Sequence, residues 1–279
     1  MRKFIIITSL FLSFLTLSCS EESIFDPEVE QVVIQAYLFA GEDITNIRVT
    51  HTFPLGDDSL STIGINDATV QLLHNDDVYD LTVSEGDSGY YHYTGDDLII
   101  QENEDYHIEI DYKGIFSSAN TSVPEKPANL LSSGTSISIP EDYSPKYFVL
   151  DSSKHLIELS WDGEPDGLYF ISIKNIEENP DSIVFLFGSG GGGMKMGKKG
   201  FISEPTSATS YTIQFQVLEF YGRHEIKVYT INQEYADLYI SRQQDSRDLN
   251  EPISNIENGL GVFSAFSGVS LYFEAIKEE

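Results

Sequence analysis

Alternation of apolar and polar residues with a period of two runs through most of this chain and limits the folds that it can adopt. Such alternation is typical of half-buried strands, in which successive side chains point to opposite faces of a sheet. Ile47, Val49 and His51, for example, share one face of a predicted strand. Patterns with the helical period are nearly absent. The sequence therefore predicts a mainly β protein.

The first half of the chain holds a group of short predicted strands. Seven runs are rich in β-branched and aromatic residues: 32–38, 46–53, 68–73, 78–83, 90–93, 106–112 and 116–123. The sequence from His74 to Asp77, between two of them, suits a hairpin turn. About seven strands in ~95 residues have the size and rhythm of an immunoglobulin-like or transthyretin-like sandwich. We therefore expect a β-sandwich domain over residues 30–123.

Residues 124–145 interrupt this pattern. Four prolines lie there among serines and glycines: Pro124, Pro127, Pro140 and Pro145. Proline has no backbone N–H to donate to a strand ladder. This segment is therefore predicted to be a Pro/Ser-rich linker between domains.

A second β-rich domain is expected over residues 146–279. Its predicted strands are 155–161, 168–176, 182–187, 210–220, 224–231 and 259–276. The one helical pattern, residues 232–247, starts at an N-cap-capable Asn232 and carries Tyr235, Leu238 and Tyr239 along one side. The prediction is thus two β-sandwich-like domains with one short helix near the C-terminus.

Residues 1–18 have the pattern of a signal peptide. Arg2 and Lys3 precede an apolar run from Phe4 to Leu17, which at about 14 residues is too short for a bilayer span of roughly 20. The only cysteine, Cys19, follows. Leu15 to Cys19 resembles the lipobox of bacterial lipoproteins, in which the cysteine is acylated and begins the mature chain. The alternative is an ordinary signal peptide with a coincidental cysteine.

Residues 19–29 are expected to form an acidic tether after the lipidated Cys19. Ser20 is not the aspartate that retains lipoproteins at the inner membrane. Glu21 and Glu22 resemble the export signal of surface-exposed lipoproteins in Bacteroidetes-type bacteria. The alternative is that acidic residues are common throughout this chain. The resemblance implies an outer-membrane lipoprotein that faces the cell exterior.

The net charge excludes several classes of partner. The chain has 45 Asp and Glu against 16 Lys and Arg, a formal charge of -29. Removal of the signal peptide takes away two basic residues, so 14 remain against 45 and the charge becomes -31. Such a surface repels phosphate backbones and anionic headgroups. Nucleic-acid binding and docking on a membrane through a basic face are therefore excluded.

A glycine-rich segment holds the one basic cluster of the mature chain. Residues 192–198 match the spacing G-x-x-x-x-G-K, but Lys199 stands where a phosphate-binding loop needs a Ser or Thr, and no helix start follows. We interpret the segment as a loop between strands. Lys195, Lys198 and Lys199 make it a candidate for contact with a partner or an anionic ligand. The alternative is a plain solvated loop.

No catalytic residue, metal site or cofactor is predicted. The six histidines form no H-x-x-x-H or H-x-H pair, and the sequence has no G-x-S-x-G motif. No spacing singles out a pair of carboxylates for glycoside hydrolysis among the 45 acidic residues. Structural calcium at an acidic pair such as Asp76 and Asp77 is the remaining alternative, without the Asp-x-Asp-x-Asp-Gly spacing. Trp161, inside a predicted strand, is expected in the core.

The order of segments carries a family resemblance. NIRVTHTFPL, NDATVQLLHNDDVYDLTV and DYHIEIDYKGIFSSANTSVP follow one another, and YADLYISRQQ precedes PISNIENGLGVFSAF. This order, and above all Ser254 to Phe263, is similar to the DUF4249 family of Bacteroidetes outer-membrane lipoproteins. Where the family often has a glycine this chain has Asn258, which leaves Gly259 and Gly261 to supply the turn.

The resemblance supplies no activity and no catalytic residues. It implies an outer-membrane lipoprotein that is often encoded beside a TonB-dependent transporter. The expected function is therefore that of a non-enzymatic accessory to such a transporter in nutrient capture. A stand-alone surface module that binds carbohydrate or peptide, and a structural or adhesive surface protein, are the alternatives.

Overall fold

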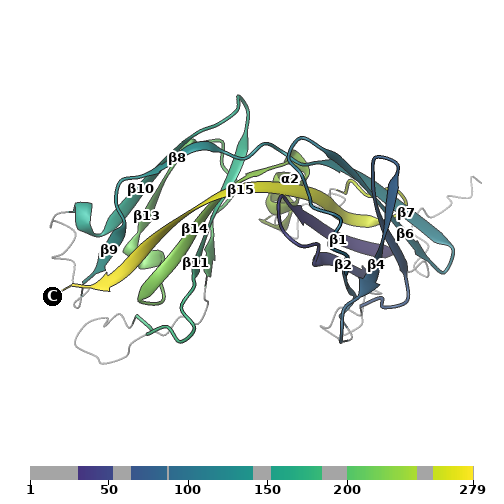
Figure 1. Ribbon diagram of the computed structural model, residues 1–279, viewed down its shortest axis with the longest axis horizontal. Coiled ribbons are helices and arrows are strands. Elements are labelled where there is room, and N and C mark those ends of the chain that lie inside the picture. The colour runs from purple at the N-terminus through teal and green to yellow at the C-terminus, as the bar shows by residue number, and fades with distance from the viewer. Residues whose placement is uncertain are drawn as a thin grey trace, which may run out of the picture. The chain divides into compact units, whose positions relative to one another are not determined.

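The computed structural model describes residues 31–52, 64–86, 88–140, 152–183, 200–243 and 254–278. Within these ranges the chain forms fifteen strands and a single α-helix (Figure 1). The predicted mainly β fold is therefore confirmed. No helix among the described residues is long and apolar enough to cross a membrane.

Seven strands come from the first half of the chain. They are β1 (Val32–Phe39), β2 (Asn46–His51), β3 (Thr69–His74), β4 (Asp77–Val83), β5 (Tyr90–His92), β6 (Asp105–Tyr112) and β7 (Ile115–Ser122). Strands β3 and β4 form the expected hairpin, whose turn places Asn75 at a φ of 55°. In β1, buried and half-buried residues alternate along the strand. The inward side chains form one core, in which Ile34 and Ile47 meet Leu72 and Ile108.

Eight further strands follow along the rest of the chain. They are β8 (Ala128–Ser132), β9 (Ser136–Ile139), β10 (Leu156–Asp162), β11 (Leu168–Asn175), β12 (Gly200–Ile202), β13 (Ser210–Gln214), β14 (Gly222–Ile231) and β15 (Leu260–Lys277). Strands β13, β10 and β8 form a separate three-stranded sheet. This sheet shares a second core with β11, β14 and the end of β15. Trp161 lies in that core, 4% exposed, with its ring edge-on to Tyr169.

One strand, β15, joins the two halves of the chain. Its first residues pair in parallel with β1, from Val33 with Leu260 to Phe39 with Phe266. Its later residues pair antiparallel with β14 and in parallel with β9. The strand runs through both groups of strands in Figure 1. The predicted boundary after residue 145 therefore does not separate two self-contained sheets, because residues 260–266 complete the sheet of the first half.

The described part of the predicted linker, residues 124–140, contains two strands. Residues 128–132 and 136–139 are strands β8 and β9, which pair with β10 and β15. Pro127 immediately precedes β8 and Pro140 immediately follows β9, so the prolines mark strand ends. The segment is also tied down by Lys126, whose Nζ donates to Glu102 Oε1 over 2.9 Å.

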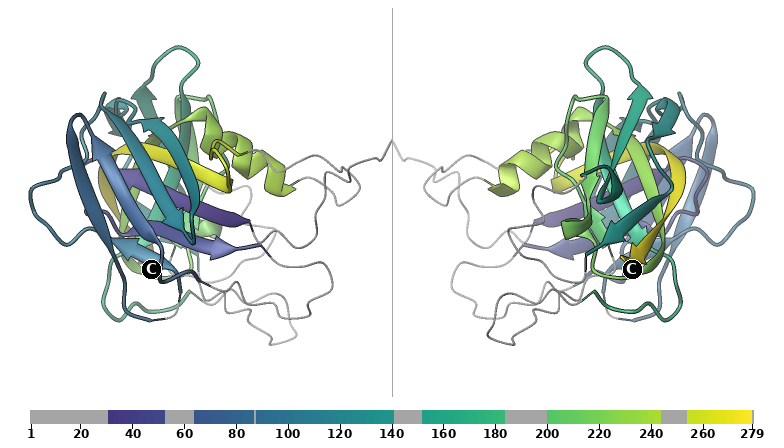
Figure 2. Two further views of the ribbon diagram at one scale, coloured as in Figure 1. Left: turned by 90° about the vertical axis from the view of Figure 1, so that its right-hand side faces the viewer. Right: turned by 90° about the vertical axis from the view of Figure 1, so that its left-hand side faces the viewer.

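Helix α2 (Gln233–Gln243) follows β14 directly. The predicted helix spanned 232–247, and its residues 244–247 lie outside the described ranges. Figure 2 shows the helix beside β15 and β1. Its Tyr235 ring contacts Phe266 edge-on, with centroids 4.9 Å apart, and Tyr37 at 5.9 Å. This aromatic cluster therefore ties the helix to β1 and β15.

Candidate functional site

Two sets of predicted site residues lie outside the described residues: Cys19, Ser20, Glu21 and Glu22, and Lys195, Lys198 and Lys199. Their roles remain predictions. Among the residues that the structure does describe, no group of three or more His, Cys, Asp and Glu side chains is arranged to hold a metal ion. The candidate sites are therefore the pockets of the described surface.

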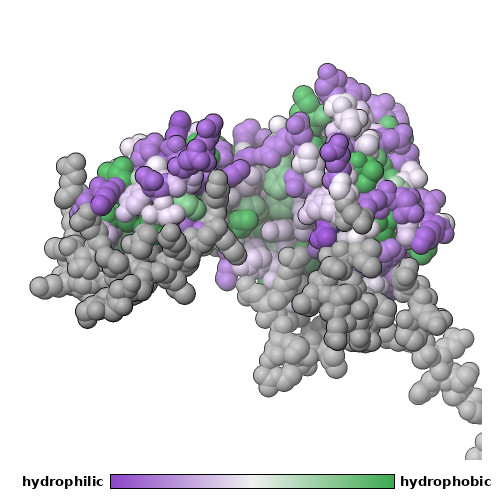
Figure 3. Space-filling model, turned by 90° about the horizontal axis from the view of Figure 1, so that it is seen from below, coloured by the Kyte–Doolittle hydropathy of each residue, from purple (hydrophilic) through white to green (hydrophobic). Residues whose placement is uncertain are grey.

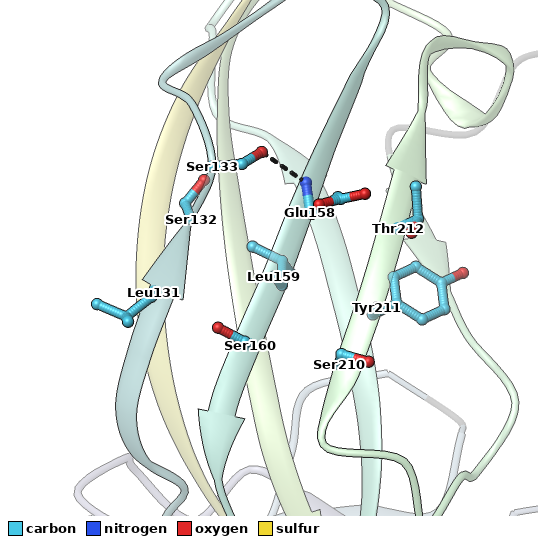
Figure 4. Close-up of a pocket in the computed structure, with 9 residues that line it drawn as sticks. All are labelled: Leu131, Ser132, Ser133, Glu158, Leu159, Ser160, Ser210, Tyr211 and Thr212. Carbon is cyan, nitrogen blue, oxygen red and sulfur yellow. Dashed lines mark hydrogen bonds between the residues drawn. The ribbon is translucent and has the colours of Figure 1, made fainter. Parts of the chain in front are cut away.

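One pocket of about 450 Å³ lies on the three-stranded sheet (Figure 4). Hydroxyl side chains predominate in its lining: Ser132, Ser133, Ser160, Ser210 and Thr212. Ser133 Oγ accepts a hydrogen bond from the Glu158 backbone N–H over 2.9 Å. Leu131 is 64% exposed beside these polar groups. The pocket offers short polar side chains and one carboxylate on an open sheet surface.

A second pocket, of about 530 Å³, is the one built from the most distant parts of the sequence. It is named the β7–α2 pocket after the two elements between which it lies. Its lining residues are Asp105 at the start of β6, Asn120, Thr121 and Ser122 at the end of β7, and Asn232, Gln233 and Glu234 at the start of α2. All seven are polar. Such a volume is typical of small-molecule sites.

Asn232 fixes the start of α2 against β7. Its Nδ2 donates to Thr121 Oγ1 over 3.1 Å and to the Ser122 carbonyl oxygen over 2.8 Å. Thr121, only 5% exposed, donates in turn from its hydroxyl to Glu234 Oε1 over 3.3 Å. The side chain predicted as a helix cap therefore bridges two elements that are about 110 residues apart in sequence.

The other lining residues are held in the same way. Ser122 Oγ donates a very short hydrogen bond to Asp105 Oδ1. Asn120 Oδ1 accepts from His107 Nδ1 over 2.8 Å, and Gln233 Nε2 donates to Asp237 Oδ1 over 2.7 Å. The pocket is thus a preformed polar surface, in which hydrogen bonds between the side chains fix the carboxylates and amides. Sequence reasoning missed it, because no motif connects residues 105, 120–122 and 232–234.

The segment Ser254 to Phe263 has a structural role. Asn255 exchanges two hydrogen bonds with the Phe263 backbone. Asn258 Nδ2 donates to the Phe116 carbonyl oxygen over 3.3 Å, and the Asn258 carbonyl oxygen accepts from Ser117 Oγ over 3.0 Å. These contacts attach the start of β15 to the edge strand β7.

The turn in this segment differs in part from the expected one. Asn258 itself adopts a φ of 54°, in the left-handed region where asparagine is tolerated, and Gly261 has a φ of 114°. Gly259 does not have a positive φ; it provides space beside Ile256 and the Val32 carbonyl oxygen. Asn258 and Gly261, rather than Gly259 and Gly261, therefore supply the left-handed residues.

A third, much smaller hollow has His224 in its lining, and this residue is 3% exposed. Burial lowers the pKa of this imidazole, while the Gly222 carbonyl and the Glu177 carboxylate act in the opposite direction. Its Nδ1 donates to the Gly222 carbonyl oxygen over 2.9 Å, and its ring stacks on Phe273. His224 is thus a neutral core residue that supports β14 and β15.

No curated protein matches this chain. Among solved structures it is similar to domains A168–A170 of titin, with 12% identity, 90% of this chain and 68% of that chain covered, and a TM-score of 0.24. It is also similar to a cytokine receptor complex, with 8% identity, 86% and 94% coverage, and a TM-score of 0.25. At these values the two likenesses carry no functional information.

A family model described as a domain of unknown function, DUF4249, matches residues 20–271. The matched range contains all of strands β1 to β14, helix α2 and most of β15. The chain therefore belongs to the DUF4249 family.

Proposed function

We propose that this protein is a surface-exposed outer-membrane lipoprotein that binds rather than catalyses, and that it is an accessory to a TonB-dependent transporter in nutrient capture. The observation that carries the proposal is the lipobox-like sequence ending at Cys19, after a basic and then apolar segment. Acyl chains on Cys19 would anchor the protein, since each buried CH₂ contributes about 0.8 kcal/mol. Glu21 and Glu22 supply the proposed export signal.

The described surface supports a binding role. Both larger pockets are open and mostly polar in their lining, and they lie on strands and at a helix start. Figure 3 shows hydrophilic side chains spread over the described surface that is visible from below. A covalent lipid requires no basic docking face, so a mature chain with a charge of -31 can still belong to an anionic membrane.

Co-purification tests the transporter partnership. A tagged full-length protein, extracted in mild detergent from its own cells, is expected to enrich a TonB-dependent receptor. Cys19→Ala serves as the control, because it removes the lipid and leaves the folded part unchanged. Absence of any such receptor from the wild-type eluate, in an otherwise clean preparation, would remove the support for this partnership.

Protease treatment of intact cells tests the orientation. The wild-type protein is expected to be cleaved together with known surface proteins. A variant in which Glu21 and Glu22 are both serine is expected to be protected while it remains in the membrane fraction. Equal protection of wild type and variant would contradict surface exposure but not lipidation.

The same pockets are also compatible with the alternative function, a stand-alone surface module that binds carbohydrate or peptide. The hydroxyl-lined pocket on β8, β10 and β13 is the observation that favours it. A glycan and peptide array probed with the purified protein distinguishes the two functions. Strong array binding without receptor enrichment favours the stand-alone module, whereas receptor enrichment favours the accessory role. An adhesive role would require attachment defects in cells that lack the gene.

A further inference from the structure

The side chains of the β7–α2 pocket define the chemistry of the group that it can accept, because most of their donors are already used. Both hydrogens of the Asn232 amide point to Thr121 and Ser122. The Thr121 hydroxyl donates to Glu234, and the Ser122 hydroxyl donates to Asp105. The side-chain donors left over belong to the Asn120 amide and to one hydrogen of Gln233, beside the backbone N–H groups at the start of α2.

Several side-chain acceptors of the pocket, in contrast, have no hydrogen-bond partner among the described residues. Asp105 and Glu234 each use one carboxylate oxygen in these bonds, and the second oxygen of each has no partner among the described residues. The side-chain carbonyl oxygens of Asn232 and Gln233 also have no hydrogen-bond partner among the described residues. Four side-chain acceptors, two of them charged, therefore face a ligand against one amide and a single further hydrogen as side-chain donors. The remaining donors are the backbone N–H groups in the first turn of α2.

The charge of the pocket agrees with this count. Among the described residues no Lys, Arg or His lines it, so the two carboxylates are the formal charges of its described lining. The helix start adds a partial positive charge of roughly half a unit, which Glu234, in the first turn of α2, already offsets. The rest of the protein is acidic as well, and its field attracts cations towards this surface.

The geometry points to a primary ammonium or guanidinium group as the ligand of the β7–α2 pocket. Such a cation brings three to five donors and no acceptor, which is the complement of this lining. The same chemistry is found in the lysine or arginine side chain of a peptide and in a free polyamine. This inference deepens the proposed capture function, and its importance for the cell rests on that function; the binding itself can be measured without a transporter.

Calorimetry on the full-length protein in uncharged detergent tests the inference. The probes are Nα-acetyl-lysine methylamide, Nα-acetyl-arginine methylamide and spermidine, with Nα-acetyl-norleucine methylamide as the uncharged match of lysine. Binding of at least one cationic probe and no binding of the norleucine compound are expected. Preference for the two amino-acid probes would indicate a peptide side chain, and preference for spermidine a free polyamine. Equal binding of the lysine and norleucine compounds would overturn the inference.

Two isosteric variants localise the binding. Glu234→Gln and Asp105→Asn are each expected to weaken the cationic probe about tenfold, because each removes one charged acceptor. Glu158→Gln, in the pocket on β10, removes the same charge elsewhere and is expected to bind as the wild type does. Equal weakening by all three variants would show that only the general acidic field attracts the probe, and would overturn the site. Unchanged melting temperatures ensure that a loss of binding is not a loss of folding.

The tests of the site and of the proposed function fail separately. A TonB-dependent receptor can co-purify with Glu234→Gln as with the wild type while the variant no longer binds the probe. Conversely, the purified protein can bind the cationic probe when no receptor enriches with it. The first result would show that the receptor does not contact the protein through this pocket. The second would show that the pocket binds a cation although the protein is not an accessory to such a receptor.

Discussion

Asn255 pairs with the backbone of Phe263 as a neighbouring strand would. Its Nδ2 donates to the Phe263 carbonyl oxygen over 2.7 Å, and its Oδ1 accepts from the Phe263 N–H over 2.9 Å. The side-chain amide thus satisfies both backbone groups of Phe263, a residue with no exposed surface. The residues that carry the family resemblance therefore hold β15 in place instead of forming a reactive site.

Asn255→Asp tests this pairing. A carboxylate accepts from the Phe263 N–H but has no hydrogen for the carbonyl oxygen, which is left buried and faces a like-charged atom. We expect a loss of about 1–3 kcal/mol in the free energy of unfolding, measured by chemical denaturation. Asn46→Asp is the matched control, because Asn46 is exposed and its amide makes only a 3.4 Å contact with Thr45. Equal losses in the two variants would contradict the pairing.

Gly261→Ala tests the close approach of β15 to β1. A Cβ atom at residue 261 would lie 1.9 Å from the Ile34 carbonyl oxygen, and the φ of 114° is unfavourable for any residue with a side chain. We expect a loss of about 3 kcal/mol or more, or a failure to fold, seen as a lower melting temperature or loss of soluble protein.

Gly134→Ala provides the control for this substitution. The nearest atoms to a Cβ at residue 134 are 4.0 Å away, and the backbone there is not left-handed. This variant is expected to melt within a few degrees of the wild type. A Gly261→Ala protein that melts equally high would show that β1 and β15 can separate without cost.

Most strands were predictable because each shows a local alternation of apolar and polar residues, but β8, β9 and β12 were not predicted. The hairpin of β3 and β4 shows this, since its turn residues lie between two runs of period two. The sequence near a strand does not show which other strand it pairs with. Nothing near Leu260 indicates parallel pairing with Val33, about 227 residues earlier, and parallel strands have no tight turn to signal them. Pro127 and Pro140 led to the incorrect prediction of a linker for a related reason. The sequence shows that a proline interrupts a strand pattern, but only the tertiary structure shows that a paired strand begins or ends beside it.

The β7–α2 pocket was not predictable for the same physical reason. Asn232 carries a helix-cap signal, which predicts the start of the helix. Its amide donates instead to Thr121 and Ser122, which reach it only because β15 brings the two halves of the chain together. A polar residue at a helix start therefore indicates the helix, but not the site that it helps to build.

His224 gives the protein a predictable response to acid. Burial lowers its pKa below the value of 6.5 that the unfolded chain has, so the unfolded state takes up a proton at a pH where the folded state does not. The free energy of unfolding therefore falls as the pH drops through 6.5 towards the folded pKa, and it is unaffected by this residue above that window. Histidine NMR titration is expected to give a pKa below 6.5 for His224.

Asn175→Asp is the variant that reverses this effect. The Asn175 Nδ2 lies 3.3 Å from His224 Nε2 and favours the unprotonated ring, because it can only donate to it. A carboxylate at this position accepts from a protonated Nε2, so the pKa of His224 is expected to rise. A His224 pKa that stays the same in the variant would show that burial alone sets it.

Glu102 and Lys126 provide a test of the segment that the sequence assigned to a linker. Burial raises the pKa of Glu102, but the bonds from the Lys126 ammonium and backbone N–H outweigh it, so the pKa is lowered overall. The pKa of Lys126 is raised by the same carboxylate. A group with a lowered acidic pKa stabilises the fold above its unfolded pKa, and this contribution is lost as the pH falls through the folded pKa.

Lys126→Met is therefore expected to raise the pKa of Glu102, measured by carboxylate NMR titration. The effect on stability is expected to be small, because the Lys126 side chain is 54% exposed and solvent screens the pair. The backbone bond from residue 126 to Glu102 remains in this variant, so β8 is expected to stay paired with β10. Lys113→Met, which removes the same charge at the β6–β7 turn, is expected to leave the pKa of Glu102 unchanged. If residue 126 did not contact Glu102, the two variants would give the same pKa for Glu102. A difference between them would therefore show that the segment before β8 is attached to the first seven strands.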